Sequence, residues 1–300
     1  MPITALIFSL IASLLVWISG RRDTIRAPQV TAVAITLLLA FPLLSLLPKF
    51  AILPAAETAS LTRAANRDIL QAIWITGAAI LSLRVILATL AIERWRSASQ
   101  LIESIPLGRR RVEVRVLSSI QSPVAAGVIR PIVLVPQNWT SWPADVRKMV
   151  LAHELAHHRR LDPLWRSLGA MACALHWFNP LVWWLVRQHS IQAEFACDAM
   201  VIRNGIQARS YASLLCDLAS SQSSPLPAAA MSETSSLGQR VARLMHPAGG
   251  ISPLLSALLI AGITAAAIGI AVLQRAKPKA STVPVIEIQT RLSADPFPGN

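Results

Sequence analysis

Four long apolar stretches constrain the fold of this 300-residue chain more than any other feature. Each is long enough to cross about 30 Å of hydrocarbon as a helix. They cover residues 1–19, 27–48, 69–92 and 251–273, and the third is interrupted by only one charge, Arg84. Hydrophobic residues make up 54% of the chain and charged residues 14%, which excludes a disordered chain, a collagen and a coiled coil. The sequence predicts an α-helical membrane protein with four crossings.

The basic residues predict how these helices are oriented. Arg21, Arg22 and Arg26 follow the first stretch and no positive charge precedes it. Lys and Arg favour the cytoplasmic side of a membrane, and a cleaved signal peptide carries its positive charge before the apolar run. We therefore expect a retained anchor and a cell-membrane protein whose two termini, including a short tail over 274–300, are extracytoplasmic. Residues 1–92 would contain three of the helices, and 93–250 would be cytoplasmic.

The net charge of +13 is explained by this membrane setting. Basic residues that flank membrane helices face an anionic leaflet. The chain contains no recognition-helix pattern, zinc-finger spacing or aromatic-basic stripe. The lipid bilayer is thus an expected partner, and direct nucleic-acid binding is not expected.

Residues 93–250 have the pattern of a small α+β domain. Apolar and charged residues alternate over 112–117, which predicts a half-buried strand. A strand pair is expected over 123–128 and 132–135. Helical patterns follow over 144–160, over 163–178 and from 181 beyond 197, and a loop rich in Ser, Pro and Ala is expected over 222–236.

The residues His153-Glu154-Leu155-Ala156-His157 form an H-E-x-x-H motif on one of these helices. A spacing of four places both imidazoles on one helical face, where each can give a nitrogen to one Zn²⁺. Glu154 can act as the general base toward a water that zinc activates. Taken alone, the motif leaves open a second interpretation, two solvated histidines on an amphipathic helix.

Two acidic residues further along the chain favour the metal-site interpretation of the H-E-x-x-H motif. Glu194 and Asp198 are the only acids between Asp162 and Asp217, and their spacing places them on one helical face. Glu194 is the candidate third zinc ligand. Asp198 is a candidate to hydrogen-bond a ligand histidine. Three protein ligands with an open position are typical of catalytic zinc, whereas an ordinary charged helix face is the alternative.

The intervening sequence must fold back for this site to form. Residues 167–186 carry no Asp, Glu, Lys or Arg and look like a membrane span, but a crossing would separate His157 from Glu194. Pro disfavours helix in the residue before it, so Asn179-Pro180 predicts a break and a membrane-associated helical hairpin near 164–187.

Two further residues have predicted roles near this site. Asp162 is expected to cap the helix that begins at Pro163. Tyr211, the only tyrosine, is a candidate oxyanion donor, weighed against ordinary packing.

Four blocks of sequence together resemble those of the BlaR/MecR-type membrane zinc peptidases, the antirepressors of inducible beta-lactam resistance. The blocks are S-P-V-A-A-G-V-I-R-P-I-V-L-V-P at 122–136, H-E-L-A-H-H-R-R-L-D-P-L at 153–164, H-W-F-N-P-L-V-W-W at 176–184 and E-F-A-C-D at 194–198. The resemblance covers about residues 1–273. It implies a gluzincin-like domain inserted between the third and fourth helices, with His153, His157 and Glu194 as zinc ligands and Glu154 as base. It also implies that a signal activates cleavage of a transcriptional repressor and of the chain itself.

The resemblance has one departure and leaves alternatives open. The 27 residues from Gln274 contain no Ser-x-x-Lys site, so we expect no C-terminal penicillin-binding sensor domain and assign no antibiotic sensing. A housekeeping membrane zinc protease of the prenyl-protein or quality-control type would carry the same motifs, as would a non-enzymatic, zinc-stabilised signalling scaffold. A homodimer also stays open. A substrate strand is expected to pair with a sheet edge within 112–135.

Overall fold

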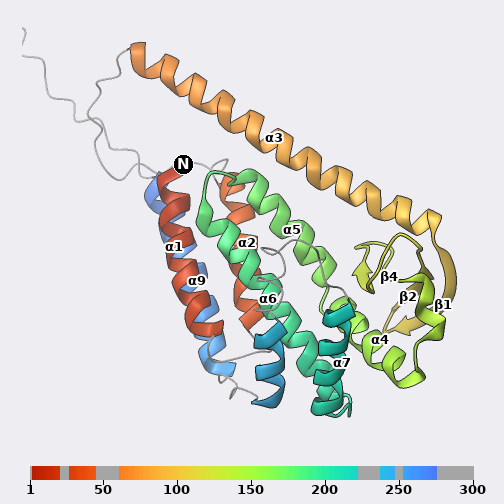
Figure 1. Cartoon of the computed structure of the whole chain (residues 1–300). Helices are drawn as coiled ribbons and strands as arrows, with labels where there is room; N and C mark the ends of the chain where they lie inside the picture. Colours follow the sequence, from red (N-terminus) through yellow and green to blue (C-terminus); the bar gives the residue numbers. More distant parts are fainter. Residues whose placement is uncertain (1, 21–26, 45–60, 222–236, 247–252, 276–300) are drawn as a thin grey trace, which may run out of the picture.

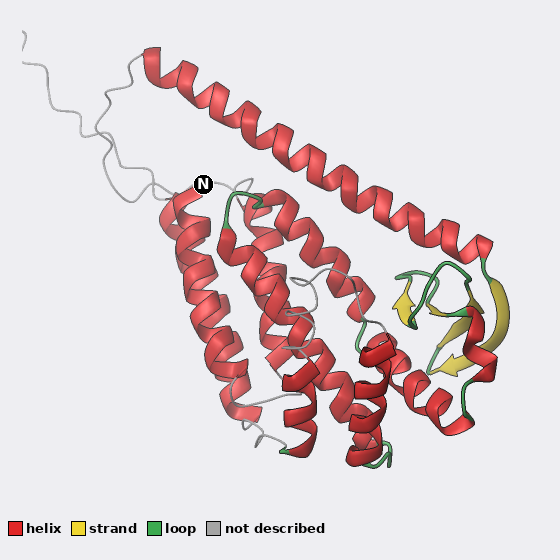
Figure 2. Ribbon diagram, viewed as in Figure 1, coloured by secondary structure: helices red, strands yellow, loops and turns green. Residues whose placement is uncertain are grey.

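The computed structural model describes residues 2–20, 27–44, 61–221, 237–246 and 253–275. The predicted loop over 222–236 and the tail after residue 275 lie outside these residues. Helices form a bundle, and a small sheet lies beside it (Figures 1 and 2). The bundle consists of α1 (Pro2–Gly20), α2 (Ala27–Leu44), α5 (Asp162–Leu175), α6 (Pro180–Arg203) and α9 (Pro253–Arg275). The chain is thus mostly helical with a small sheet, as predicted.

The bundle encloses an apolar core to which helices from both ends of the chain contribute. Its fully buried side chains include Phe8 and Val16 of α1, Val30, Ile35 and Leu38 of α2, Val182 and Leu185 of α6, and Ile263 of α9. Two polar contacts fix the α5–α6 turn to the bundle: Asn179 Nδ2 donates to Ser9 Oγ (2.7 Å), and His176 Nε2 donates to the Leu38 carbonyl (3.1 Å). These buried hydrogen bonds tie the α5–α6 hairpin to α1 and α2.

The predicted break between α5 and α6 is confirmed. α5 ends at Leu175 and α6 begins at Pro180. The Asn179 side chain accepts a hydrogen bond from the Leu181 amide (3.1 Å), which satisfies a donor that the start of the helix leaves free. The chain therefore turns back, and the C-terminal half of α6 returns to the vicinity of the H-E-x-x-H helix.

The structure supports one membrane-capable helix where the sequence predicts four. Within the described residues, only the 68–98 segment of α3 (Leu61–Ala98) is long and apolar enough to cross a membrane, by length and composition alone. Its apolar side chains are mostly exposed, because α3 lies along the outside of the bundle (Figure 1). The apolar stretches of α1, α2 and α9 are shorter, at Ile7–Trp17, Ala27–Ala40 and Leu254–Ile268. Four crossings stay a prediction.

The sheet has four strands in the order β1-β2-β4-β3. They are β1 (Gln100–Leu107), β2 (Arg110–Val116), β3 (Val124–Ala126) and β4 (Ile132–Val135). β2 and β4 pair in parallel, and the two outer pairs are antiparallel. The three predicted strands are confirmed with small changes in their bounds, whereas β1 was not predicted. β1 is mostly exposed, because it forms an edge of the sheet.

Both faces of the sheet are covered. On one face, Val112, Val114, Val133 and Val135 pack against α4 (Ala144–Arg159), α6 and α7 (Ala208–Ser221). On the other face, Ile132 and Leu134 pack against Ile92 of α3. All four residues of β4 are buried for this reason, as is typical of a central strand.

Candidate metal centre

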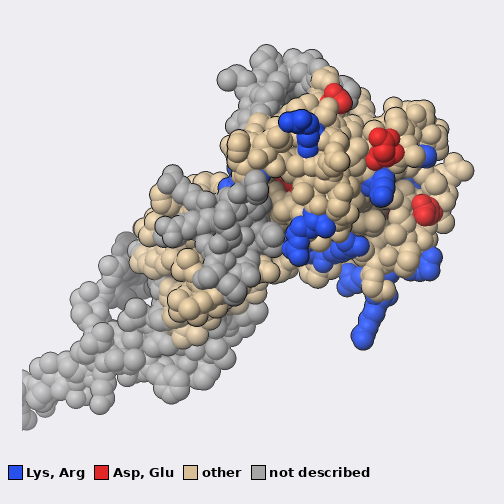
Figure 3. Space-filling model, turned by 90° about the horizontal axis from the view of Figure 1, so that it is seen from below, with Lys and Arg blue, Asp and Glu red and all other residues tan. Residues whose placement is uncertain are grey.

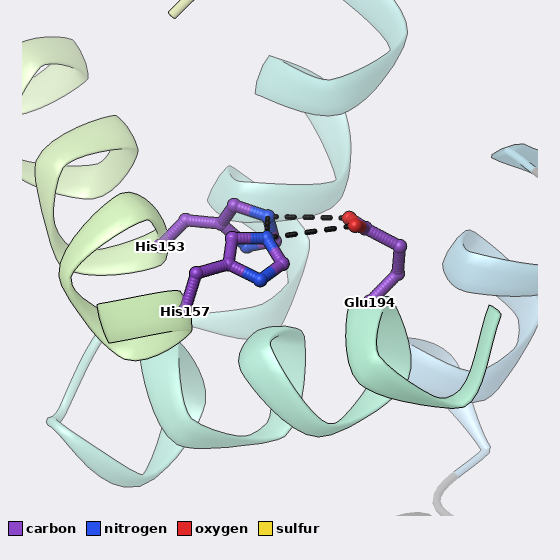
Figure 4. A group of neighbouring side chains, drawn as sticks. All are labelled: His153, His157 and Glu194. Carbon is purple, nitrogen blue, oxygen red and sulfur yellow. Dashed lines mark hydrogen bonds and ion pairs between the residues drawn. The ribbon is translucent and has the colours of Figure 1, made fainter. Parts of the chain in front are cut away.

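The H-E-x-x-H motif lies on α4, which is anchored to the sheet. His158, next to the motif, donates from Nε2 to the Ile132 carbonyl of β4 (2.9 Å). His153, Glu154 and His157 are all buried. The facing helix is α6, which brings Glu194 opposite the two histidines (Figure 4).

Two imidazole nitrogens and the carboxylate of Glu194 converge at this point. His153 Nε2 lies 3.2 Å from His157 Nε2. Glu194 Oε2 lies 3.3 Å from His153 Nε2, and Glu194 Oε1 lies 3.5 Å from His157 Nε2. Ligands at 2.0–2.1 Å from a tetrahedral zinc ion are separated by about 3.3 Å. The three donors therefore have the spacing that a zinc ion requires, and His153, His157 and Glu194 form a group that could hold a metal ion.

Asp162 has a different position from the one predicted. It is the first residue of α5, after a left-handed Leu161, and its side chain makes no cap. Instead, it is 1% exposed and accepts a hydrogen bond from His157 Nδ1 (2.8 Å). A carboxylate only accepts, so the proton of His157 resides on Nδ1 and the Nε2 lone pair is free for a metal. Asp162 thus orients a candidate ligand, and Pro163 follows it in the first turn as expected.

Asp198 and Tyr211 occupy the corresponding position behind His153. The Tyr211 hydroxyl donates to Asp198 Oδ1 (2.8 Å) and lies 2.9 Å from His153 Nδ1, which donates to it. Asp198 Oδ1 also lies 3.2 Å from His153 Nδ1. Asp198 therefore contacts a candidate ligand histidine. Tyr211 is 1% exposed and its hydroxyl contacts this pair, which favours a role in support of His153 over the candidate role as an oxyanion donor.

Two arginines that the sequence analysis did not single out for this site approach the carboxylates of Glu194 and Asp198. Arg240 donates from Nε to Asp198 Oδ2 (2.8 Å) and from an Nη to Asp198 Oδ1 (2.7 Å). Its other Nη lies 3.5 Å from Glu194 Oε2. Arg166 of α5 is more exposed and lies 3.7 Å from Glu194 Oε1. No local sequence pattern identifies Arg240, because its partners precede it by more than forty residues.

The ionisation of the site follows from these contacts. Burial opposes the charged form of His153, but hydrogen bonds to Asp198 and Glu194 outweigh it and raise the His153 pKa to about 9. Burial likewise opposes ionisation of Glu194, but its contacts with His153 and His157 hold its pKa well below the usual range. The pKa of Asp198 falls to about 2, because hydrogen bonds from Arg240 and His153 outweigh its burial. Without metal, an imidazolium thus lies between two carboxylates.

Cys197 lies behind His157 and forms a second potential donor group with His157 and Asp162. Its sulfur is 3.3 Å from His157 Nδ1 and donates to Asp162 Oδ2 (3.5 Å). Burial raises the thiol pKa well above its usual range, so the group is neutral. A neutral thiol is a poor metal ligand, and the His157 Nδ1 already carries a proton. These residues therefore support His157 rather than form a second metal site.

Comparisons with known proteins identify the family of this chain. The profile of the family described as BlaR1 peptidase M56 matches residues 5–244. The regulatory protein BlaR1 of Bacillus licheniformis is 32% identical over 144 residues, an alignment that covers 44% of this chain and 24% of that relative. The aligned part is thus about a quarter of the relative's length.

Proposed function

Because the chain belongs to the BlaR1 peptidase M56 family, we propose that it is an integral membrane zinc endopeptidase that transduces a signal by cleaving a cytosolic transcriptional repressor and itself. The observation that carries the proposal is the approach of His153 Nε2 and His157 Nε2 to each other (3.2 Å) and to the two carboxylate oxygens of Glu194, Oε2 at 3.3 Å from His153 and Oε1 at 3.5 Å from His157. The similarity to a protein named as regulatory favours a signalling role over a housekeeping one.

Each residue of the site has its own role in the proposed reaction. A zinc ion bound here would supply Lewis acidity, polarising the scissile carbonyl and making water a stronger acid. Glu154, buried on α4 between the two histidines, accepts the proton of the attacking water and returns it to the leaving nitrogen. Asp162 and the Asp198–Tyr211 pair hold both imidazoles with Nε2 directed at the metal.

The substrate is proposed to bind as an added strand. Within residues 112–135, β2 and β4 are both internal, so β3 is the free edge. β3 also contacts α4, which carries the motif. An extended peptide paired with β3 would satisfy the edge's backbone groups and run beside the metal centre.

The charge distribution supports a cytoplasmic site. The N-terminus of α1 lies at the upper end of the bundle, whereas α4 and the C-terminal half of α6, which carry the candidate ligands, lie lower (Figure 1). Lys and Arg side chains predominate over acids on the face seen from below (Figure 3). Basic residues favour the cytoplasmic side. A reporter fused after Asn300 tests this orientation. If the C-terminus is extracytoplasmic, the reporter should be active only outside the cytoplasm.

The test of the proposal uses detergent-purified protein and the candidate repressor as substrate. Glu154→Gln should retain zinc and lose cleavage, because it removes the base and keeps every ligand. His153→Ala should lose both. Cleavage by Glu154→Gln would refute the assignment of the base. Zinc binding without any cleavage by the wild type would favour a scaffold. Indiscriminate cleavage of unrelated proteins would favour a housekeeping protease.

A further inference from the structure

A short helix over residues 237–245 docks beside the metal centre. Leu237 and Leu244 pack against the apolar core beneath α7, and Arg243 places its guanidinium over the Phe195 ring of α6, 4.2 Å from the centroid. Arg240 points to the same side. The helix precedes α9 in the sequence, with residues 247–252 between them.

Arg240 is the member of this helix that contacts the metal centre. It binds both oxygens of Asp198, which is 2% exposed, and approaches the Glu194 carboxylate. The same Asp198 oxygen that accepts from Arg240 accepts from Tyr211 and faces His153 Nδ1. One side chain thus sets the orientation of the carboxylate behind His153 and lies against the carboxylate of the candidate third ligand.

We propose that Arg240 is a positioning residue of the metal centre, so that the site binds zinc tightly only while the 237–245 helix is docked against α6. The inference rests on the proposed zinc site. Two-point contact between a guanidinium and a carboxylate fixes the carboxylate plane, which one point charge does not do. Without Arg240, Asp198 keeps its buried charge but loses the two hydrogen bonds that fix the plane of its carboxylate. The orientations of the His153 ring and of the Glu194 carboxylate toward the metal are then no longer fixed.

Helix docking and zinc binding affect each other. If docking of the helix raises zinc affinity, bound zinc must stabilise the docked helix by the same factor. The helix is adjacent in sequence to α9, a candidate membrane helix, so displacement of α9 offers a route by which a signal loosens the metal centre. Substrate contacts are not required for this effect.

The experiment compares three variants of the full chain in detergent. Arg240→Gln removes the contact, and Arg240→Lys keeps the charge but not the two-point geometry. Gln239→Ala is the matched control, since Gln239 is an exposed residue of the same helix. Zinc affinity is measured by chelator competition, coordination by the absorption spectrum of the Co²⁺-loaded protein, and docking by hydrogen exchange of residues 237–245 with and without zinc.

We expect Arg240→Gln to weaken zinc binding by about 10–100-fold and to change the Co²⁺ spectrum, as loss of a residue behind a metal ligand does. Arg240→Lys should recover part of the loss, Gln239→Ala should stay within about threefold of the wild type, and zinc should slow exchange of the helix. An Arg240→Gln protein with wild-type affinity and spectrum would overturn the proposal, as would equal losses in Arg240→Gln and Gln239→Ala.

Two further outcomes are decided by the same data. If Arg240→Gln does not fold, Arg240→Lys decides, because wild-type affinity and spectrum in that variant would also overturn the positioning role. Every readout is metal binding or exchange, so a chain that binds zinc but cleaves nothing refutes the proposed peptidase and leaves the Arg240 comparison intact.

Discussion

Zinc binding to this protein should depend steeply on pH, because the metal replaces a tightly held proton. In the metal-free site, the pKa of His153 is raised to about 9, as its Nδ1 faces Asp198 and its Nε2 faces Glu194. Zinc needs the Nε2 lone pair, so the proton must leave before the metal binds. The carboxylates do not add to this effect, because their pKa values are lowered and both are ionised at neutral pH.

The size of the effect follows from the His153 pKa. One competing proton weakens the apparent affinity by about 100-fold at pH 7 and about tenfold at pH 8, relative to a fully deprotonated site. The logarithm of the apparent affinity should therefore rise by about one per pH unit from pH 6.5 to 8.5 and level off above pH 9. The sign is fixed, since a group whose pKa is raised in the metal-free fold opposes metal binding below that pKa.

The assay is chelator competition across this pH range, with the chelator's own protonation taken into account. Calorimetry at pH 7 in two buffers of different ionisation enthalpy gives an independent count and should find about one proton released per zinc bound. An affinity that is flat between pH 7 and 8.5, with no proton released, would refute the assignment of a protonated His153 between two carboxylates.

Two substitutions test other parts of the structure. Asp162→Asn should weaken zinc binding by about 10–100-fold, because an amide no longer fixes the His157 tautomer through a charge-assisted hydrogen bond, while Asn in place of the exposed Asp217 should leave chelator competition unchanged. Gly77→Val should lower stability by about 1–3 kcal/mol in detergent melts, because a Cβ at Gly77 would lie 2.6 Å from the Trp177 ring. Gly262→Val, in open space on α9, is its control, and an equal loss there would refute the packing argument.

Local periodicity explains which parts of the fold could be predicted. The apolar helices, the i, i+4 spacing of His153 and His157, and the Asn179-Pro180 break are all encoded within a few residues. β1 lacks such a signal, because an exposed edge strand with Glu103 and Pro106 shows little alternation. Length and apolarity alone do not show which helices meet a membrane, since α1, α2 and α9 also pack on one another.

In the candidate site, too, the residues set by local spacing could be predicted and those brought in by tertiary packing could not. Its three candidate ligands lie on two helices, and helical geometry places His153 and His157 on one face of α4. Three of the residues behind the candidate ligands come from other elements: Asp162 from α5, Tyr211 from α7 and Arg240 from the 237–245 helix. Only tertiary packing brings these three together, and for this reason the sequence suggested a cap for Asp162, an oxyanion role for Tyr211 and no site role for Arg240.

Because three of the supporting residues lie on other elements than the candidate ligands, the metal centre can be regulated without moving the ligand helices. The candidate ligands belong to α4 and α6, which the sheet and the bundle hold by buried contacts such as His158 to Ile132. The contacts behind His153, by contrast, include Arg240, on a helix bounded on both sides by residues 222–236 and 247–252 that join it to α7 and α9. A change in the docking of that helix can therefore alter the orientation of Asp198 and Glu194 while the scaffold that carries the ligands stays in place. Metal affinity can respond to a distant helix without any change in the ligand set.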